Sequence, residues 1–472
     1  MTPEEFRKHG HRLIDWIADY RASISERPVM SLAEPGSIRA QLPRAAPQDP
    51  EPFDEVLADL DRVIMPGITH WNHPRFFAYF PSNAGLASVL ADLVSSGLGS
   101  QAMSWQTSPA ATELEETMME WLRQAVALPD SFSGVIQDTA STATLVALLC
   151  ARERSLKYGQ NRDGMTGRLV VYASQEGHSS IEKAALLAGF GKENLRLLST
   201  DDAHALRPDL LAQAIGEDLS RGLRPCAVVA AVGTTGTTAI DPVREIAELA
   251  RQHGLWLHVD AALAGSAMIL PECRGLWRGV EHADSVVFNP HKWLGVGFDL
   301  SAYYVRDPEH LIRVMSTNPS YLQTQADGRV KNLRDWGLQL GRRFRALKLW
   351  FLFRDQGLSG LQQRLRRDLE NAQWLAAQVD RTPGWQRLAP VPLQTVCIRH
   401  LPSGTTGLAD DEPALRAHNL LIADQVNRSG RAYLTPSVLK GRQMLRVSIG
   451  AEATTRADVE ALWALLQQVS SG

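Results

Sequence analysis

The feature that most limits the possible folds of this chain is a regular alternation of apolar runs and helical patterns between about residues 85 and 350. The runs lack an alternating polar face, which is typical of strands buried on both faces. Strands of this kind, separated by helices, form a mostly parallel sheet with crossover connections. The predicted strands are GVIQD (134–138), LVVYAS (169–174), CAVVAAVG (226–233), LWLHVDA (255–261), SVVFN (285–289) and residues 301–305, and the predicted crossover helices include residues 141–157, 179–190 and 242–253.

The segments on either side of this region have a different character. Thr2, Pro3 and Glu5 predict the start of a helix, prolines then favour an extended run up to residue 50, and a second helix follows over 53–64. These segments have little core of their own and must pack on the main domain or on another subunit. Beyond residue 362 a helix and the runs TVCIRH and MLRVSIG predict a small α+β domain. We therefore expect an N-terminal helical dimerisation segment (1–84), a large domain (85–355) and a small C-terminal domain (356–472).

Composition excludes several classes of protein. Hydrophobic residues make up 44% and charged residues 21% of the 472 residues, as in ordinary globular chains. A net charge of -3 gives no reason to expect nucleic acid or an anionic membrane as a partner. The four cysteines are widely spaced and form no C-x-x-C pair, so we expect reduced core thiols, no metal site and a cytoplasmic location, with no membrane span.

Polar residues follow the predicted strands at the points where they end. TAST (139–142), His178, GTT (233–235), Asp260 and Lys292 each come after a different strand. In open α/β sheets, ligands bind beyond the carboxyl ends of the strands. Each feature also has an ordinary explanation: a helix N-cap, a structural histidine, a polar turn, a cap for the next loop, and a lysine at the surface.

Taken together, these residues predict a pyridoxal 5'-phosphate site. The helix N-terminus at Thr139–Ser141, together with Thr235, offers donors for a phosphate. Asp260 matches a basic ring nitrogen, and His178 matches a flat ring face. Lys292 matches the aldehyde carbon, with which it forms a Schiff base.

This interpretation gives each charged residue a chemical reason. Asp260 keeps the ring nitrogen protonated, so that the cofactor accepts the electron pair released when a bond to the substrate α-carbon breaks. Lys292 lies between two strands, where desolvation favours the neutral amine and so makes it a better nucleophile.

The sequence also resembles a known family. NPHKW, HVDAALAG, VIQDTASTATLVALL, HSSIEKAALLAGF and LGRRFRALKLWF resemble the group II pyridoxal-phosphate-dependent decarboxylases, most closely the bacterial aromatic-L-amino-acid (DOPA) decarboxylases. The resemblance runs from about Glu4 to the C-terminal helix. It implies the α/β fold of fold type I, which is like that of aspartate aminotransferase, and a homodimer whose active site is shared between subunits.

The resemblance also assigns roles to individual residues. It implies that Lys292 holds the cofactor as an imine, that Asp260 meets the pyridine nitrogen and that His178 stacks on one ring face. The other implied cofactor contacts are Ala140, Ser141, Thr235, Ala262, Asn289 and His291. The implied substrate contacts are Trp71, Tyr79, Phe80, Pro81, Met103 from the other subunit, and Gly341; Ser82 or Thr107 is added as a partner for a ring hydroxyl.

Tyr321, in NPSYLQTQADG, matches the tyrosine of the family's closing loop, which protonates the α-carbon after carbon dioxide leaves. Two positions depart from the family pattern. Asp138 stands where many relatives have Gly, which affects the expected geometry of the phosphate loop. Leu263 replaces an aromatic residue of animal members, which affects local packing.

These observations predict a carboxy-lyase that decarboxylates aromatic L-amino acids, with L-DOPA and 5-hydroxytryptophan preferred and tyrosine and tryptophan as further substrates. One alternative is an aromatic aldehyde synthase, although relatives of that kind typically replace the loop tyrosine or the stacking histidine. A group II decarboxylase of another amino acid, such as glutamate, is a further alternative, but FFAYFPSN offers no cation for a second carboxylate. A non-catalytic regulator would need a DNA-binding segment, and the lone GVG is a weak dinucleotide signal.

Overall fold

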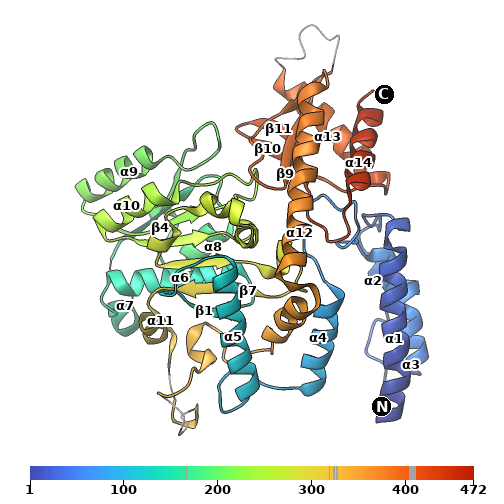
Figure 1. Ribbon diagram of the computed structural model, residues 1–472, viewed down its shortest axis with the longest axis horizontal. Helices are drawn as coiled ribbons and strands as arrows, with labels where there is room; N and C mark the ends of the chain where they lie inside the picture. The colour runs from blue at the N-terminus through green and yellow to red at the C-terminus, as the bar shows by residue number, and fades with distance from the viewer. Residues whose placement is uncertain (165–166, 318, 323–324, 326–327, 403–410, 472) are drawn as a thin grey trace. The chain divides into compact units, whose positions relative to one another are not determined.

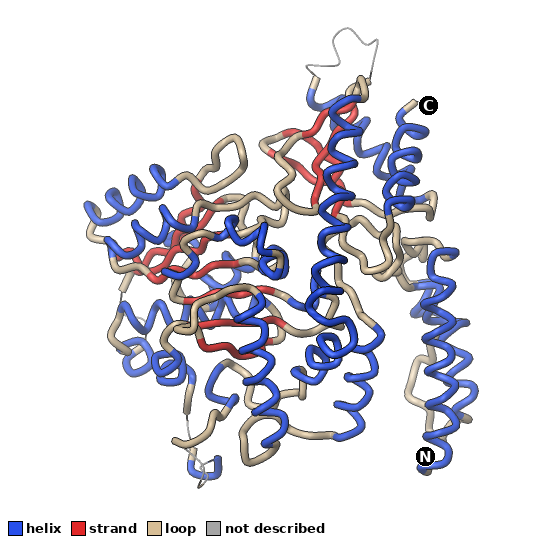
Figure 2. Tube along the Cα trace, viewed as in Figure 1, coloured by secondary structure: helices blue, strands red, loops and turns tan. Residues whose placement is uncertain are grey.

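The computed structural model describes residues 1–164, 167–317, 319–322, 325, 328–402 and 411–471. The chain divides into two compact units. The first unit comprises Met1–Pro81, Trp374–Leu388 and Cys397–Gly472, and the second comprises Ser82–Gln373 and Ala389–Val396. Figures 1 and 2 trace the chain and show that its strands form two sheets. The three-part division expected from the sequence stays a prediction.

A seven-stranded sheet forms the centre of the second unit, in the order β1-β7-β6-β5-β4-β2-β3. Strands β6, β5, β4, β2 and β3 are parallel to one another, whereas β7 is antiparallel to both of its neighbours, β6 and β1. Strand β1 therefore runs in the same direction as β6, and every strand except β7 ends at the same edge of the sheet. The strands are β1 (Ser133–Gln137), β2 (Leu169–Ser174), β3 (Leu195–Leu198), β4 (Arg224–Ala231), β5 (Trp256–Asp260), β6 (Ser285–Phe288) and β7 (Ser301–Val305).

Helices cover both faces of this sheet. Successive residues of a strand point to opposite faces. Val171 and Ala173 of β2 pack in a cluster with α6 and α8, whereas Tyr172 between them donates a hydrogen bond to Asp218 of α9 (2.8 Å). The helices of this unit are α4 (Leu86–Leu98), α5 (Pro109–Ala125), α6 (Ala140–Ser155), α7 (Gly159–Asp163), α8 (Ser180–Leu187), α9 (Pro208–Ser220), α10 (Val243–His253), α11 (Pro308–Met315) and the first part of α12 (Ala346–Arg381).

The predicted strands and helices of this region are confirmed to within two or three residues at most ends. Strand β2 and strand β7 have the predicted bounds, and α6, α8 and α10 match the predicted crossover helices. Strand β3 was not predicted, because it lies at the edge of the sheet, none of its residues is buried, and its sequence LRLL lacks a continuous apolar run. The α/β class with a mostly parallel sheet is confirmed.

The first unit contains a four-stranded sheet in the order β10-β11-β9-β8. The predicted N-terminal helix is α1, which starts with a capping box between Thr2 and Glu5, and the predicted second helix is α3 followed by a π-helical turn to Ile64. No residue of α1 is buried in the chain. The elements are α1 (Pro3–Ser23), α2 (Ser37–Gln41), α3 (Phe53–Asp59), the end of α12, β8 (Trp385–Arg387), β9 (Thr395–His400), α13 (Glu412–Arg428), β10 (Thr435–Leu439), β11 (Arg442–Ser448) and α14 (Arg456–Ser470), with the first two residues of β9 counted in the second unit.

A buried ion pair fastens β1 to the chain that precedes α12. Arg342 donates to Glu115 of α5 (2.7 Å) and to the carbonyl of Ile136 (2.9 Å), and the N–H of Ile136 donates to the same carboxylate (2.8 Å). Both charged side chains are about 3% exposed. A buried pair of this kind costs much more to break than it contributes in net stability, because the remaining charge is left without compensation.

We therefore expect Glu115→Ala to lower the free energy of unfolding by about 3–5 kcal/mol. Glu120→Ala on the same helix is the matched control, because its pair with Arg123 is half-exposed and is expected to cost about 0–1 kcal/mol. Urea unfolding followed by tryptophan fluorescence measures both values. Equal losses for the two variants would contradict the assignment of a buried, uncompensated charge.

Candidate active site

The carboxyl edge of the large sheet gathers the residues that the sequence analysis took from separate strands. Asp260 ends β5, Thr235 follows β4, His178 follows β2, and Lys292 follows β6. The charge of Asp260 raises the pKa of His178 and the charge of Lys292 lowers it, so the three side chains lie within electrostatic range of one another. The predicted convergence of these residues on one edge is therefore observed, while their individual roles stay predictions.

Asp260 is a nearly buried carboxylate, 7% exposed. Its Oδ1 accepts a hydrogen bond from the N–H of Ala262 (3.1 Å), which closes the turn after β5. Within the described residues, Oδ2 accepts no hydrogen bond, so this oxygen remains available to a donor above the sheet.

His178 presents a neutral ring at the same edge. Desolvation lowers its pKa, so the imidazole is uncharged at neutral pH. The N–H of Ser180 donates to Nδ1 (3.2 Å), so the ring proton is on Nε2. Nδ1 and the Ser180 hydroxyl also lie 2.8 Å apart, and this pair fixes the orientation of the ring.

The N-terminus of α6 provides backbone donors beside these side chains. The Thr139 hydroxyl caps the helix by accepting from the N–H of Thr142 (3.4 Å). The N–H groups of Ala140 and Ser141 in the first turn have no intrahelical acceptor, as at every helix start. The predicted phosphate-binding residues are therefore placed where an anion is stabilised.

Asp138, the departure from the family pattern at this loop, is bonded within the protein. Its Oδ1 accepts from the N–H of Thr139 (2.6 Å), and its Oδ2 accepts from Gln339 Nε2 (2.6 Å). The carboxylate therefore holds the start of α6 against the segment around residue 339. The other departure, Leu263, is fully buried.

The turn after β4 projects Thr235 from the sheet. Gly233 has φ +86°, and a Cβ there would lie 2.8 Å from that of Ala264, so glycine is required. The hydroxyls of Thr234 and Thr237 lie 3.2 Å apart and both accept from the N–H of Ala239, which closes the turn. Thr235 is left exposed at its tip.

Lys292 lies in a short π-type turn, Pro290–Leu294, that follows β6. Asn289 is buried before it and accepts a hydrogen bond from Ser301 of β7 (2.5 Å), while its N–H donates to the carbonyl of Ala262 (2.9 Å). His291 is also buried; its Nδ1 accepts from the N–H of Leu300 (2.9 Å), and burial lowers its pKa to about 3. Asn289 and Ala262 therefore adjoin the lysine turn and His291 lies within it, while their implied contacts with the cofactor stay predictions.

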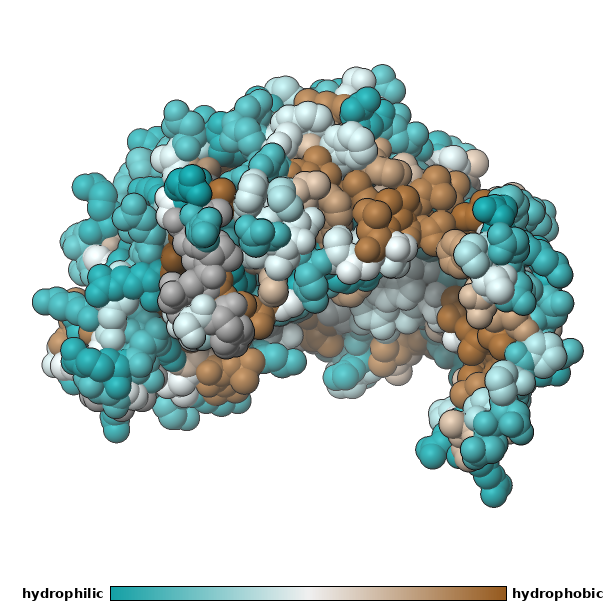
Figure 3. Space-filling model, turned by 90° about the horizontal axis from the view of Figure 1, so that it is seen from below, coloured by the Kyte–Doolittle hydropathy of each residue, from teal (hydrophilic) through white to brown (hydrophobic). Residues whose placement is uncertain are grey.

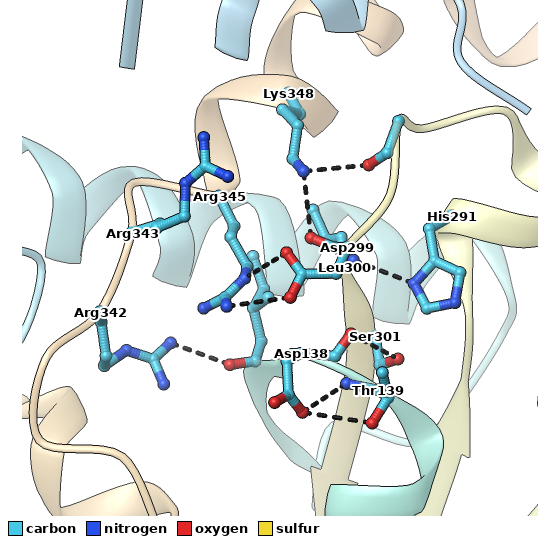
Figure 4. Close-up of polar contacts among 12 residues, drawn as sticks. Asp138, Thr139, His291, Asp299, Leu300, Ser301, Arg342, Arg343, Arg345 and Lys348 are labelled. Carbon is cyan, nitrogen blue, oxygen red and sulfur yellow. Dashed lines mark hydrogen bonds and ion pairs between the residues drawn. The ribbon is translucent and has the colours of Figure 1, made fainter. Parts of the chain in front are cut away.

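The loop from Gly295 to Asp299 is held by cations from the start of α12. Arg345 forms a two-point ion pair with Asp299 (3.0 and 3.1 Å), and Lys348 donates to the carbonyls of Gly297 (2.9 Å) and Asp299 (3.1 Å). Figure 4 shows these contacts beside His291 and the Asp138–Thr139 corner. These contacts hold the backbone that follows the lysine turn.

Three of the predicted substrate contacts lie in the second unit. Ser82 precedes Asn83, whose side chain donates to the carbonyl of Lys292 (3.1 Å). Met103 and Gly341 lie on adjoining segments, because the backbone carbonyl of Arg342 accepts a hydrogen bond from the N–H of Ala102 (3.0 Å). Gly341 is exposed. The hydroxyl of Thr107 lies 2.8 Å from the carbonyl of Gln101 and 3.0 Å from that of Ser104, so it is already bonded inside its own turn.

The other four predicted substrate contacts lie together in the first unit. Trp71 stacks on Tyr79 with ring centroids 5.4 Å apart, and Phe80 and Pro81 follow directly. Sequence analysis missed Arg446 here. Its guanidinium lies over the Phe80 ring at 4.5 Å and donates to the carbonyl of Tyr79, and burial lowers its pKa to about 10. An arginine inside the apolar run MLRVSIG was the available signal.

Tyr321 belongs to a short 3-10 turn, Ser320–Leu322, and its side chain lies outside the described part of the structure. Its predicted role therefore stays a prediction.

A buried histidine beneath Asp260 was also missed. His258 lies two residues before Asp260 on β5, so both face the same side of the sheet. Its ring lies 2.9 Å from the Ser285 hydroxyl and 3.3 Å from that of Thr144, and burial lowers its pKa to about 4. A polar residue inside LWLHVD was the signal that could have identified this link between the sheet and α6.

The described groups fit pyridoxal 5'-phosphate. The fit rests on three observations: a nearly buried carboxylate with one oxygen open, helix-start N–H groups without intrahelical acceptors, and an exposed threonine at the next strand end. Neighbouring strands in a sheet lie about 4.8 Å apart, so a ring with its phosphate group has the length to extend over several strand ends.

Comparisons with known proteins agree with this chemistry. Residues 35–400 match the family described as "Pyridoxal-dependent decarboxylase conserved domain". Phenylacetaldehyde synthase of Arabidopsis thaliana is 41% identical, with 100% of this chain and 97% of that protein covered. Aromatic-L-amino-acid decarboxylase of Bos taurus is 39% identical, with 100% and 97% covered. A crystal structure described as Oryza sativa TDC with PLP and tryptamine superposes with a TM-score of 0.96 at 36% identity, covering 100% of this chain and 98% of that one. The predicted fold type I is thereby confirmed.

The buried histidines predict a loss of stability in acid. His258 has a pKa of about 4 in the fold but about 6.5 when unfolded, so between these values the unfolded chain binds the extra proton. The stability that the fold gains from keeping His258 neutral is therefore fully present above pH 6.5, and it is lost as the pH falls toward 4. We expect His258→Gln to reduce the dependence of the free energy of unfolding on pH in this range. The expected reduction corresponds to one proton, about 1.4 kcal/mol per pH unit.

Urea unfolding at several pH values between 7 and 4.5 measures the slope. His282→Gln is the control, because that histidine is exposed and its replacement is expected to leave the slope unchanged. Identical slopes for the parent and His258→Gln would show that His258 is not the group concerned.

Proposed function

This chain belongs to the pyridoxal-dependent decarboxylase family, and we propose that it is a pyridoxal 5'-phosphate-dependent carboxy-lyase that converts aromatic L-amino acids to the corresponding amines and carbon dioxide. The observation that carries this proposal is the gathering of Asp260, His178 and Lys292 at one sheet edge, beside the N-terminus of α6. Family relatives named as aromatic amino acid decarboxylases support the substrate class.

The residues of this edge divide the work of holding the cofactor. The N–H groups of Ala140 and Ser141, with the hydroxyl of Thr235, bind the phosphate. Lys292 holds the aldehyde carbon, and Asp260 accepts a hydrogen bond from the protonated ring nitrogen. Pyridoxal phosphate, when bound, supplies the electron sink for the pair that is left when the carboxylate departs.

The neutral state of His178 suits it to cover a ring face. An uncharged imidazole does not compete with the protonated ring nitrogen for Asp260, and the Ser180 contacts keep it in one orientation. Tyr321 supplies the proton to the α-carbon, after its loop has excluded water from the site.

An aromatic aldehyde synthase is the second candidate, and the phenylacetaldehyde synthases among the relatives favour it. That activity also consumes oxygen and water and releases aldehyde, ammonia and peroxide together with carbon dioxide. This chain keeps both Tyr321 and His178, of which one is typically replaced in such enzymes. We therefore place amine formation first.

The proposed substrate class rests on the aromatic residues Trp71, Tyr79 and Phe80. Ring contacts of about 0.5–1.5 kcal/mol each favour an aromatic side chain over an aliphatic one. L-DOPA and 5-hydroxytryptophan are the proposed preferred substrates, with tyrosine and tryptophan also accepted. Because Thr107 is bonded within its own turn, Ser82 is the better candidate to meet a ring hydroxyl.

We further propose a homodimer, which helix α4 supports most directly. This helix buries Ser88, Ala91 and Ser95 and exposes its large apolar residues, so its apolar face needs a partner. The exposed residues are Leu86, Leu90, Leu93, Val94 and Leu98. Helix α1 buries no residue at all within the chain, which also suits a partner. Figure 3 shows apolar patches on the face that it displays.

The same face includes residues of the site. Arg343, two positions after Gly341, donates to Asp92 of α4 (3.2 Å). A second copy that covers α4 therefore also meets the segment of Gly341 and, adjoining it, Met103. This supports an active site shared between subunits.

A cytoplasmic location is also proposed. The four cysteines are buried free thiols, which suits a reducing compartment. In the described residues, no helix has the length and apolar character that crossing a membrane requires.

The substrate proposal predicts an order of kcat/KM. We expect L-DOPA and 5-hydroxytryptophan to lead, tyrosine, tryptophan and phenylalanine to follow, and histidine and glutamate to come last. Release of carbon dioxide from each L-amino acid, with pyridoxal phosphate added, measures this order. Glutamate or histidine in first place would overturn the substrate class.

Gly341→Ser provides a matched variant for the same assay. A Cβ at Gly341 would lie 3.4 Å from the Gln101 amide, an ordinary contact, so the variant is expected to fold. The added side chain is expected to lower kcat/KM for indole substrates several-fold more than for phenolic ones. An equal effect on both would exclude Gly341 from the substrate pocket.

Tyr321→Phe tests the proposed proton donor. The variant keeps the ring but lacks the hydroxyl proton, so amine formation is expected to fall at least tenfold. With oxygen present, aldehyde, ammonia and peroxide are expected to appear instead. Amine formation at the parent rate would assign the proton transfer to another group.

Leu90→Asp tests the dimer. A charge in the middle of the exposed apolar face of α4 is expected to give a soluble monomer with little activity, as measured by light scattering after gel filtration. Leu219→Asp on α9 is the control, since that leucine has an exposure of 49% but lies on a different helix. A Leu90→Asp protein that stays dimeric would exclude α4 from the interface.

A further inference from the structure

The turn that carries Lys292 depends on side chains from outside it. Its π-type closure joins the N–H of Gly295 to the carbonyl of Pro290. The carbonyls of the last residues in a helical turn have no donor within it. Here the carbonyl of Lys292 accepts from Asn83 Nδ2 at 3.1 Å.

Arg364 meets the next two carbonyls in the turn. Its Nη1 donates to the carbonyl of Trp293 (2.9 Å) and its Nη2 to that of Leu294 (2.7 Å). The side chain is 8% exposed. A Cβ at Gly295, where φ is +97°, would lie 3.1 Å from Nη2, so the glycine lets the guanidinium approach the backbone.

Asp368 holds the side chain that follows the lysine. The indole Nε1 of Trp293 donates to Asp368 Oδ2 at 2.8 Å, and both residues are 0% exposed. Asp368 lies one helical turn after Arg364 on α12, so one face of this helix holds both the backbone and the indole of the lysine turn.

We propose that Arg364 and Asp368 are positioning residues for Lys292. The lysine side chain has four rotatable bonds, so the position of its amine depends on the direction of the Cα–Cβ bond, which the backbone sets. A misplacement of about 1 Å at a reacting group costs about 100-fold in rate. By fixing Trp293 and Leu294, the two residues that follow the lysine in the turn, the two side chains direct the amine toward Asp260 and His178.

This inference rests on the proposed function, because it takes Lys292 as the residue that binds the cofactor. The test separates the two. The apoprotein is mixed with pyridoxal phosphate, reduced with borohydride at set times, and digested, and mass spectrometry gives the labelled fraction at Lys292. A parent protein that is never labelled at Lys292 would refute the proposed function itself.

Arg364→Met removes both donors while keeping most of the side-chain length. Arg364→Met with Asp368→Asn removes both charges, so that no carboxylate is left buried without its cation. For both we expect labelling of Lys292 at least tenfold slower than in the parent protein, together with weaker binding of pyridoxal phosphate. Arg366→Met is the matched control on the same helix, because its pair with Glu272 is exposed, and it is expected to label at the parent rate.

Asp368→Asn alone keeps an oxygen acceptor for the indole of Trp293. This variant is therefore expected to label Lys292 at close to the parent rate. Thermal unfolding of each apoprotein shows whether the variant is folded at the labelling temperature. If the two proteins that carry Arg364→Met are destabilised but label at the parent rate, Arg364 and Asp368 only support the fold, and the inference is wrong.

Arg364→Lys decides the matter if the larger changes do not fold. The ammonium of lysine keeps the charge but lacks the planar, two-point donor geometry of the guanidinium, so an intermediate rate of labelling is expected. Labelling at the parent rate in this variant would overturn the inference as well.

Discussion

The arrangement of the site follows from a nearly buried carboxylate at the end of β5. Removing Asp260 from water is costly unless donors and positive charges replace the lost hydration. The N–H of Ala262 supplies one donor. The negative charge of Asp260 also raises the pKa of both His178 and His258, so it interacts with a histidine beyond the strand end and with one inside the strand. Desolvation nonetheless lowers the pKa of both histidines and keeps them neutral, so neither acts as a cationic partner for Asp260.

Strand direction turns this carboxylate into a site. Because β1 and β6 both lie antiparallel to β7, the α6 N-terminus after β1 reaches the same edge as Lys292 after β6 and Asp260 after β5. The hydroxyl of Ser301, at the start of β7, lies 2.5 Å from Oδ1 of Asn289 after β6 and 3.4 Å from the carbonyl of Asp138 after β1, so it connects the ends of these two strands. An antiparallel strand inside a parallel sheet therefore places the N-terminus of α6 and the lysine at the same edge of the sheet.

Much of this could be predicted because the signals are local. Continuous apolar runs gave most strands of the large sheet, and the chain direction of a parallel sheet then placed Asp260 and Lys292 at one edge. The parts that could not be predicted depend on contacts between distant segments. Arg364 and Asp368 lie in a charged helix where neither differs in pattern from Arg366 or Arg367, and only the packing of α12 on the lysine turn distinguishes them. Arg446 and His258 interrupt apolar strands, which marks them as unusual but does not identify their partners.

Helix α4 extends this argument to the assembly. Helix α4 buries serines and exposes leucines, which is the pattern of a helix that packs on a further surface, and this pattern supports the proposed dimer. Asp92 lies among those exposed leucines and binds both Arg343 and Lys348, and Lys348 in turn holds the carbonyls of Gly297 and Asp299. Covering α4 therefore excludes water from the ion pairs that support the loop after Lys292, and ion pairs strengthen as the local dielectric falls. On the proposed dimer, assembly would thus stiffen the loop that follows the lysine turn, so that binding of the cofactor and association of the subunits would be linked through Asp92.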